Sequence, residues 1–146
     1  MKKKKIILAI IFFGIIGGGW YAYSEYTRKV KDLRHVKAGL YMEATELITA
    51  FEKDETKSNA LFLDKVIAVK GRVKTVEKSA KGHYTVILGD EGSMSSVRCS
   101  MDSVHQQDAG ALITGAFFTM KGACTGFNTD ELLGSDVILN RCVVEK

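Results

Sequence analysis

The sequence predicts a mainly β fold with short helices, in which a small closed barrel of five strands follows an N-terminal hydrophobic helix. An uncharged stretch over residues 6–23 precedes an amphipathic pattern over residues 40–51. The apolar period then changes from that of a helix to that of a strand, which marks the start of a sheet. The expected units are a transmembrane anchor at residues 1–24, a juxtamembrane stalk at residues 25–41 and a barrel domain at residues 42–146.

The positive charge of the chain lies in its N-terminal part. The formal net charge is +4, from 21 basic and 17 acidic residues. Residues 1–41 hold nine of the basic and two of the acidic residues, which leaves twelve basic and fifteen acidic residues in the domain, a net charge of −3. A mildly acidic domain argues against a general binder of polyanions.

Residues 6–23 have the length and composition of a membrane-spanning helix. These eighteen residues carry no charge. At about 1.5 Å per residue a helix of this length spans roughly 27 Å, close to the hydrocarbon thickness of a bilayer. Aromatic residues gather at its far end, where an aromatic belt is expected: Trp20, Tyr21, Tyr23 and Tyr26. We therefore expect a single-pass attachment to the cell membrane.

The residues on either side of this segment bear on its membrane orientation and on whether it is cleaved. The lysines at residues 2–5 favour a cytoplasmic N-terminus and a domain on the periplasmic side, although basic residues beyond the helix nearly balance them. A signal peptide cleaved near Ala22-Tyr23-Ser24 is the alternative to a retained anchor. Gly14 and Gly18 form a GxxxG pair that would support an anchor-mediated homodimer, but glycines are also common in membrane helices that do not pair.

The stalk and the start of the domain both show helical spacing. Apolar residues recur among basic ones from Tyr26 to Leu40, which predicts a short stalk helix on anionic headgroups or, alternatively, a solvated linker. The amphipathic helix that opens the domain follows from apolar residues at helical spacing. These residues are Leu40, Ala44, Leu47, Ile48 and Phe51.

Five strands follow this helix. They are expected at residues 66–76, 84–88, 96–101, 118–124 and 137–144. Gly71 lies inside the first strand and predicts a bulge or bend there. A short helix or loop is expected over residues 102–115, and a long polar loop over residues 126–136. Five strands with a helical insert between the third and the fourth are the pattern of an OB-fold, a Greek-key barrel.

Four short stretches also resemble the tRNA_anti-like family of OB-fold proteins. They are KVIAVKGRV at residues 65–73, VRCSM at residues 97–101, MKGACTG at residues 120–126 and VILNRC at residues 137–142. The resemblance covers roughly residues 42–146. It implies an OB barrel, often behind an N-terminal signal or anchor, with no catalytic residues and with ligands that are largely unassigned.

Three cysteines, Cys99, Cys124 and Cys142, share a strand phase with apolar neighbours and are expected to point inward. In OB topology the fifth strand lies between the third and the fourth, so Cys142 faces either Cys124 or Cys99. A disulfide would suit an extracytoplasmic domain, and Cys124–Cys142 is the expected pair. Three buried free thiols are the alternative. Since no CxxC pair is present and the histidines are scattered, we expect no metal site.

The sequence carries no recognisable catalytic motif. GxSxG, HExxH and phosphate-cradling patterns are absent from it. The acidic pairs Asp90-Glu91 and Asp130-Glu131 fall in expected turns, where exposed carboxylates are usually only solvated. We therefore expect a non-enzymatic protein without a cofactor.

A basic track along the strands raises the alternative of single-stranded nucleic-acid binding, which OB folds often perform across their second and third strands. The track contains Lys70, Arg72, Lys74, Lys78, Lys81 and Arg98. The outward positions of those two strands offer only His83 as a stacking platform. We therefore favour a solvated strand face over a nucleic-acid site.

The remaining hypothesis is a binding or interaction module for an unknown protein or small ligand. Its expected contact surface is the barrel end formed by loops at residues 77–82 and 125–136. Phe127, Leu132 and Leu133 place apolar side chains in the second loop. These side chains either contact a partner or fold back over the barrel mouth.

Overall fold

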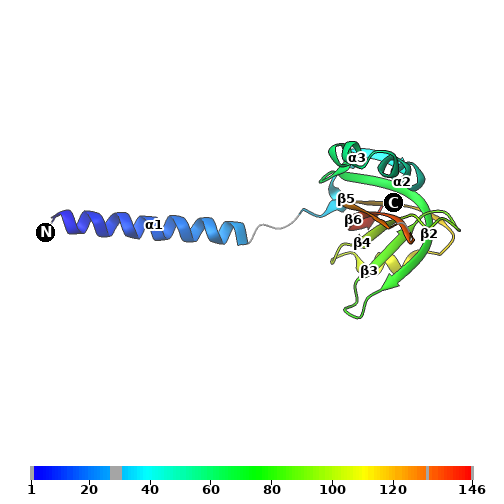
Figure 1. Cartoon of the computed structure of the whole chain (residues 1–146). Helices are drawn as coiled ribbons and strands as arrows, with labels where there is room; N and C mark the ends of the chain where they lie inside the picture. Colours follow the sequence, from blue (N-terminus) through cyan, green and yellow to red (C-terminus); the bar gives the residue numbers. More distant parts are fainter. Residues whose placement is uncertain (1, 27–30, 131, 146) are drawn as a thin grey trace. The chain divides into compact units, whose positions relative to one another are not determined.

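The computed structural model describes residues 2–26, 31–130 and 132–145, and within the first of these ranges it describes the side chains of residues 12–26. The chain forms two units, residues 1–31 and residues 32–146. The first consists of helix α1 (Lys2–Tyr26), drawn in blue in Figure 1.

The structure tests the N-terminal predictions only in part. None of the helices in its described portion is both long enough and apolar enough to cross a membrane. The side chains of residues 6–11, which begin the expected membrane segment, lie outside the described residues. So do residues 27–30 of the expected stalk.

The second unit is built around a mixed sheet of six strands in the order β1-β2-β3-β4-β6-β5, which β2 closes into a barrel by also pairing with β5. The strands are β1 (Leu40–Glu43), β2 (Val66–Lys78), β3 (Tyr84–Leu88), β4 (Ser96–Met101), β5 (Phe117–Asp130) and β6 (Gly134–Val144). The pairs β1–β2 and β4–β6 are parallel, and the other pairs are antiparallel. Without β1, the order matches the expected barrel, with the last strand between the third and the fourth.

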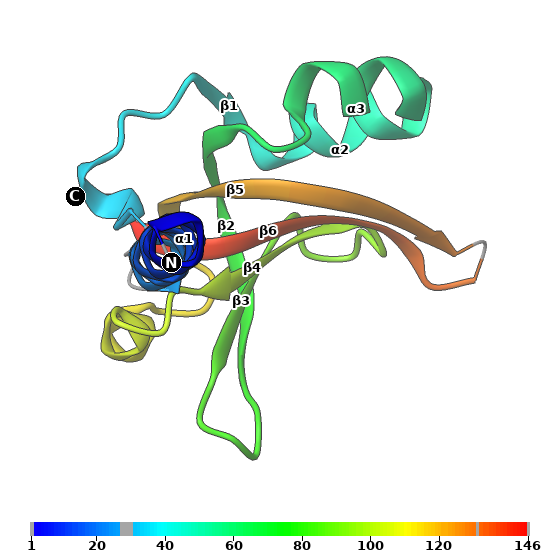
Figure 2. The ribbon, with the colours of Figure 1, turned by 90° about the vertical axis from the view of Figure 1, so that its left-hand side faces the viewer.

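Short helices cover the barrel beside β2, β5 and β6 (Figure 2). They are α2 (Ala44–Lys53) and α3 (Glu55–Phe62), and two 3-10 turns, η1 (Leu33–His35) and η2 (Gln106–Ala111), lie elsewhere on the unit. Glu43 and Glu46 form a capping box at the start of α2. The expected helix therefore starts at Ala44 rather than at Leu40, because residues 40–43 pair with β2 as a parallel strand.

The core fills the barrel and continues under α2. Leu47 and Phe51 of α2 are fully buried, together with the inward residues of every barrel strand. Gly71 lies on β2 in close contact with the start of α2, since an added Cβ there would come within 2.8 Å of the Ala44 Cβ. The expected irregularity of this strand falls instead between Val73 and Thr75.

Two further predictions are wrong within the described residues. No stalk helix forms over residues 31–39. Asp32 caps the single turn η1 there, and Leu33 is buried. The polar loop expected at residues 126–136 is mostly a hairpin, because β5 and β6 stay paired as far as Asp130 and Gly134. A two-stranded ribbon exposes polar residues on both faces. Its sequence therefore lacks the alternation of apolar and polar residues that predicts a strand, and it resembles a loop.

Candidate binding surface

The outer face of β3 and β4 is the surface with which OB barrels commonly bind single strands. Val86 and Cys99 point into the core, so their strand neighbours point outward. The register places Thr85 opposite Ser100 and Ile87 opposite Arg98. This face therefore carries one cation, Arg98, and the exposed His83 ring that the sequence predicted lies just before β3, in the hairpin turn.

Arg98 is held between two carboxylates. Its Nη2 donates to Glu77 Oε2 at 3.0 Å, and its Nη1 lies 3.8 Å from Asp136 Oδ2. Asp136 also accepts a hydrogen bond from the Ser96 hydroxyl. With two acids around one cation, the centre of the face offers no excess positive charge to a phosphate.

Of the four basic residues on β2, Arg72 and Lys74 are also engaged by partners. Lys70 is exposed to solvent. Arg72 lies 3.4 Å from Glu91 and stacks on Phe117, with 5.4 Å between the guanidinium carbon and the ring centroid. Lys74 Nζ donates to the Ser93 carbonyl at 2.6 Å. The structure therefore does not join these residues into a free basic track.

Lys78 and Lys81 lie apart from them, in the hairpin of β2 and β3 that projects from the barrel (Figure 2). Lys78 Nζ lies 5.2 Å from the Tyr84 ring centroid, a cation–π contact. Lys81 is exposed in the turn. No described carboxylate forms an ion pair with either lysine. This hairpin is the most available basic part of the predicted track.

Phe127 lies on β5 and not in a loop. Its ring stacks on that of Phe51, with 5.0 Å between centroids and 19° between planes. Phe62 packs on the other side of this group, 5.7 Å from Phe51. Phe127 therefore belongs to the packing between the barrel and its helices.

Three exposed apolar side chains form what we call the apolar tip: Met94, Leu132 and Leu133. Their exposed fractions are 68%, 80% and 75%. An added Cβ on Gly134 would lie 2.6 Å from the Met94 backbone, so the β3–β4 loop and the β5–β6 turn are in contact. Asp130 Oδ1 accepts hydrogen bonds from the Leu132 and Leu133 amides at 2.8 and 3.0 Å. These bonds hold the Leu132 and Leu133 amides against Asp130, and both leucine side chains are exposed.

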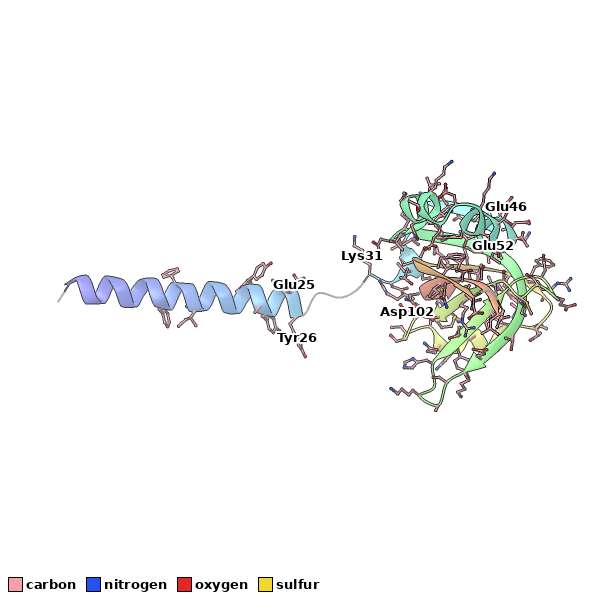
Figure 3. All side chains as sticks on the ribbon, viewed as in Figure 1. Glu25, Tyr26, Lys31, Glu46, Glu52 and Asp102 are labelled. Atoms are coloured by element: carbon pink, nitrogen blue, oxygen red, sulfur yellow. The ribbon has the colours of Figure 1, made fainter. Side chains whose placement is uncertain are left out.

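The apolar tip does not share a barrel end with the basic hairpin. The turn at residues 79–83 precedes β3, whereas Met94 follows it. The expected single surface from loops 77–82 and 125–136 is therefore wrong. Ser95 next to the tip donates to Glu52 at 2.7 Å. Glu52 lies on α2 (Figure 3), and its carboxylate together with Asp130 gives the tip an acidic border.

A polar cluster that the sequence did not predict fixes the segment at residues 32–43, here called the strap, to the barrel. Arg34 forms an ion pair with Asp108. Lys121, almost fully buried, donates to the Arg34 carbonyl at 3.2 Å and lies 3.8 Å from Glu145. These residues come from distant parts of the sequence, and no local sequence pattern predicts that they are in contact.

Two residues of the strap, Asp32 and Tyr41, have shifted pKa values because of the hydrogen bonds they form. The Arg34 amide and then the His105 ring, 2.9 Å away, hold the pKa of Asp32 below its ordinary value. Tyr41 donates its hydroxyl to Glu145 at 2.9 Å, and this hydrogen bond raises the pKa of the phenol. Pockets of ≈ 230 and ≈ 340 Å³ lie beside Glu145.

The three cysteines are buried and free, so the expected Cys124–Cys142 disulfide is wrong for this structure. The register of β5 and β6 explains the error. Cys124 lies opposite Leu139, whereas Cys142 lies at irregularities in both pairings of β6. Its sulfur contacts Gly122. The described residues contain no group of three or more His, Cys, Asp or Glu side chains suited to a metal ion.

Comparison with known proteins confirms the resemblance seen in the sequence. A model of the tRNA_anti-like family matches residues 1–143, and the match thus includes the N-terminal segment as well as the barrel. No curated protein matches the chain.

Solved structures share the fold at low sequence identity. A lipoprotein from Klebsiella pneumoniae subsp. pneumoniae MGH 78578, for which nucleic-acid binding has been suggested, is 18% identical with a TM-score of 0.58, over 81% of this chain and 100% of that protein. A protein of Leishmania major Friedlin thought to be an aspartyl-tRNA synthetase is 11% identical with a TM-score of 0.46, over 87% of this chain and 26% of its own. Aspartyl-tRNA synthetase of Entamoeba histolytica is 11% identical with a TM-score of 0.44, over 80% and 23%.

Proposed function

The chain belongs to the tRNA_anti-like family, and we propose that it is a non-enzymatic OB-type binding module, anchored in a membrane, whose domain lies outside the cytoplasm and binds a protein partner. The observation that carries the proposal is the apolar tip. Three large apolar side chains lie together in solvent, and the Asp130 hydrogen bonds keep two of them there. Contiguous exposed apolar side chains with a polar border are typical of protein interaction sites.

The chemistry of the tip defines the partner surface that would fit it. Leucine and methionine side chains gain most from a closed apolar pocket, because their burial removes apolar area from water. Glu52 and Asp130 stand at the border, so basic groups around that pocket would complement them. The partner is therefore a protein with an apolar recess and a basic edge.

The evidence for the proposed membrane anchor comes from the sequence. Residues 6–23 are uncharged and long enough to span the hydrocarbon core. The lysines at residues 2–5 favour an N-terminus in the cytoplasm. Gly14 and Gly18 would allow two anchors to pair and present two domains together. The similar Klebsiella protein is described as a lipoprotein, another way to attach an OB domain to a membrane.

Single-stranded nucleic acid is the second candidate ligand. The projecting hairpin with Lys78 and Lys81 favours it, as does the nucleic-acid binding suggested for the Klebsiella protein. Two observations argue against nucleic-acid binding: Arg98 is paired with Glu77 and Asp136, and β3 and β4 themselves carry no exposed ring. Without stacking platforms, a few lysines support mainly salt-sensitive, non-specific attachment.

Photo-crosslinking in intact cells tests the proposed partner surface. A photoreactive phenylalanine analogue replaces Leu132 in the full chain, and in a matched control it replaces Leu61, an exposed leucine of α3. We expect a discrete protein adduct at position 132 that a second substitution, Leu133→Asp, removes. Equal labelling at both positions, or none at the tip, would contradict the proposal. An enzyme reporter after Lys146 that is active only in the cytoplasm would contradict the orientation.

A further inference from the structure

Two pockets share part of their lining where the strap packs on β5 and β6. The smaller, of ≈ 230 Å³, is lined by Arg34, Lys121, Val143, Val144 and Glu145. The larger, of ≈ 340 Å³, shares Val144 and Glu145 and continues to Asp108 and to apolar side chains around η2 and β5. The Arg34–Asp108 ion pair joins a wall of one pocket to a wall of the other. The two pockets are therefore neighbours, and we call them together the strap crevice.

The ion pair between Lys121 and Glu145 in this crevice is incompletely hydrogen-bonded. The Lys121 side chain is only 7% exposed, and among the described residues its ammonium donates one hydrogen bond, to the Arg34 carbonyl at 3.2 Å. Its distance to Glu145 Oε1 is 3.8 Å, too long for a hydrogen bond. The other oxygen, Oε2, is buried and accepts no hydrogen bond from the described part of the chain.

Such groups cost free energy, because burial removes water that nothing in the protein replaces. Tyr41 satisfies Oε1 with its hydroxyl at 2.9 Å but leaves Oε2 without a donor. The crevice therefore offers a donor on Lys121 and an acceptor on Glu145 to a molecule that enters it.

The formal charges around the crevice sum to zero. Arg34 and Lys121 are cations, whereas Asp108 and Glu145 are anions. A simple ion bound here would add a charge that no group of the crevice balances, and a poorly solvated charge without a partner is costly. A ligand that carries both a positive and a negative group, with no net charge, meets Lys121 and Glu145 without this cost.

The larger pocket adds an apolar surface. Leu112, Phe118 and Val144 line it, are partly exposed and pack against the core. An aliphatic or aromatic group placed there would remove apolar area from water. The volume of ≈ 340 Å³ lies within the range of small-ligand pockets, about 300–1,000 Å³. The ligand therefore combines a dipolar head with an apolar group.

We propose that the strap crevice binds a free apolar α-amino acid. The ligand carboxylate accepts from Lys121, its ammonium donates to Glu145 Oε2, and its side chain lies against Leu112 and Phe118. Since Oε2 is covered by its neighbours, binding requires a rotation of the Glu145 side chain that turns this oxygen toward the ligand. The crevice shares no residue with the apolar tip, so this ligand is independent of the proposed protein partner.

Equilibrium dialysis with tritiated leucine tests the proposal on the full chain in lipid nanodiscs, with nanodiscs alone as the blank. We expect saturable binding with a dissociation constant between about 1 µM and 1 mM. Three unlabelled competitors each lack one part of leucine: isopentylamine lacks the carboxylate, isocaproate lacks the ammonium, and glycine lacks the apolar side chain. Each should compete at least about 10-fold more weakly than leucine.

Two substitutions locate the site. Glu145→Gln keeps the size of the side chain but removes its charge, and it should weaken leucine binding at least about 10-fold. Leu112→Trp should fill the larger pocket and abolish binding. The matched control is Glu55→Gln, which removes an exposed carboxylate of α3 and should leave binding unchanged. Circular dichroism checks that each variant is folded.

No saturable binding of leucine to the wild type up to about 10 mM would overturn the proposal. Competition by isopentylamine or isocaproate as strong as that by leucine would also overturn it, because one charged group would then suffice. Both outcomes are read on the wild type and stand even if a variant fails to fold. Equal binding to folded Glu145→Gln and Glu55→Gln would show that leucine binds elsewhere and would reject the crevice as the site.

Discussion

The outer face of β3 and β4 differs from the apolar tip, although Met94 of the tip lies in the loop that joins these two strands. On the face, Arg98 is shared by Glu77 and Asp136, so its charge is satisfied within the domain. At the tip, Met94, Leu132 and Leu133 are exposed although their backbone is fixed. The difference favours the apolar tip over the usual OB face as the proposed contact surface, because the exposed side chains without partners inside the domain lie at the tip.

The largest expected effect is the loss of stability on truncation of Phe127, an apolar residue of the β5–β6 hairpin that packs against the core. Phe127→Ala removes a ring that stacks on Phe51 and should lower the free energy of unfolding by about 2–4 kcal/mol. Leu132→Ala, at the exposed end of the same hairpin, should change it by less than about 0.5 kcal/mol. Urea unfolding of residues 32–146, followed by circular dichroism, measures both. Similar losses for the two variants would break the distinction between core and tip.

The face should gain anion binding if its acids are neutralised. Glu77→Gln with Asp136→Asn keeps acceptors for Arg98 and Ser96 but removes two negative charges. We expect the affinity for a single-stranded oligonucleotide at low salt to rise about 3- to 10-fold, with a steeper salt dependence. The matched control, Glu52→Gln with Glu55→Gln, removes the same charge from α2 and α3. An equal gain in the control would show that only net charge matters.

The smallest expected effect is the pH dependence of the strap. The pKa of Asp32 is lowered in the folded state, so its ionised form stabilises the fold above the ordinary value of 3.8, and this stabilisation is lost as the pH falls through the lower folded value. Asp32→Asn should therefore show a smaller drop in melting temperature between pH 5 and pH 3 than the wild type. Asp90→Asn, in an exposed turn, is the control. Equal pH profiles for wild type and Asp32→Asn would contradict the role given to this contact.

The sequence predicted those elements whose signal is local. Alternation identified the strand at Ser96–Met101, and helical spacing identified the buried face at Leu47 and Phe51. The order of the barrel strands followed from their number and from the position of the insert, and the structure confirms it. These signals depend only on near neighbours in the chain.

The errors concern contacts that depend on register between distant segments. The register of Cys142 is set by irregular pairing near Arg141, which no local pattern reveals. The engagement of Arg98 by Glu77 and Asp136 likewise needs three strands in a defined register. Phe127 falls in a predicted loop because the paired strands around it carry mostly polar residues. Side-chain function in a barrel therefore requires the pairing as well as the strands.

Binding of nucleic acid is the most direct test of the central claim that this domain does not act through its outer face. Fluorescence anisotropy of labelled single-stranded DNA and RNA, titrated with residues 32–146 across a salt series, measures it. We predict no submicromolar binding at physiological salt, and only weak attachment, on the order of 10⁻⁴ to 10⁻⁶ M, that salt removes. Submicromolar binding at physiological salt that disappears on charge reversal of Lys70, Arg72 and Lys74 would contradict the account.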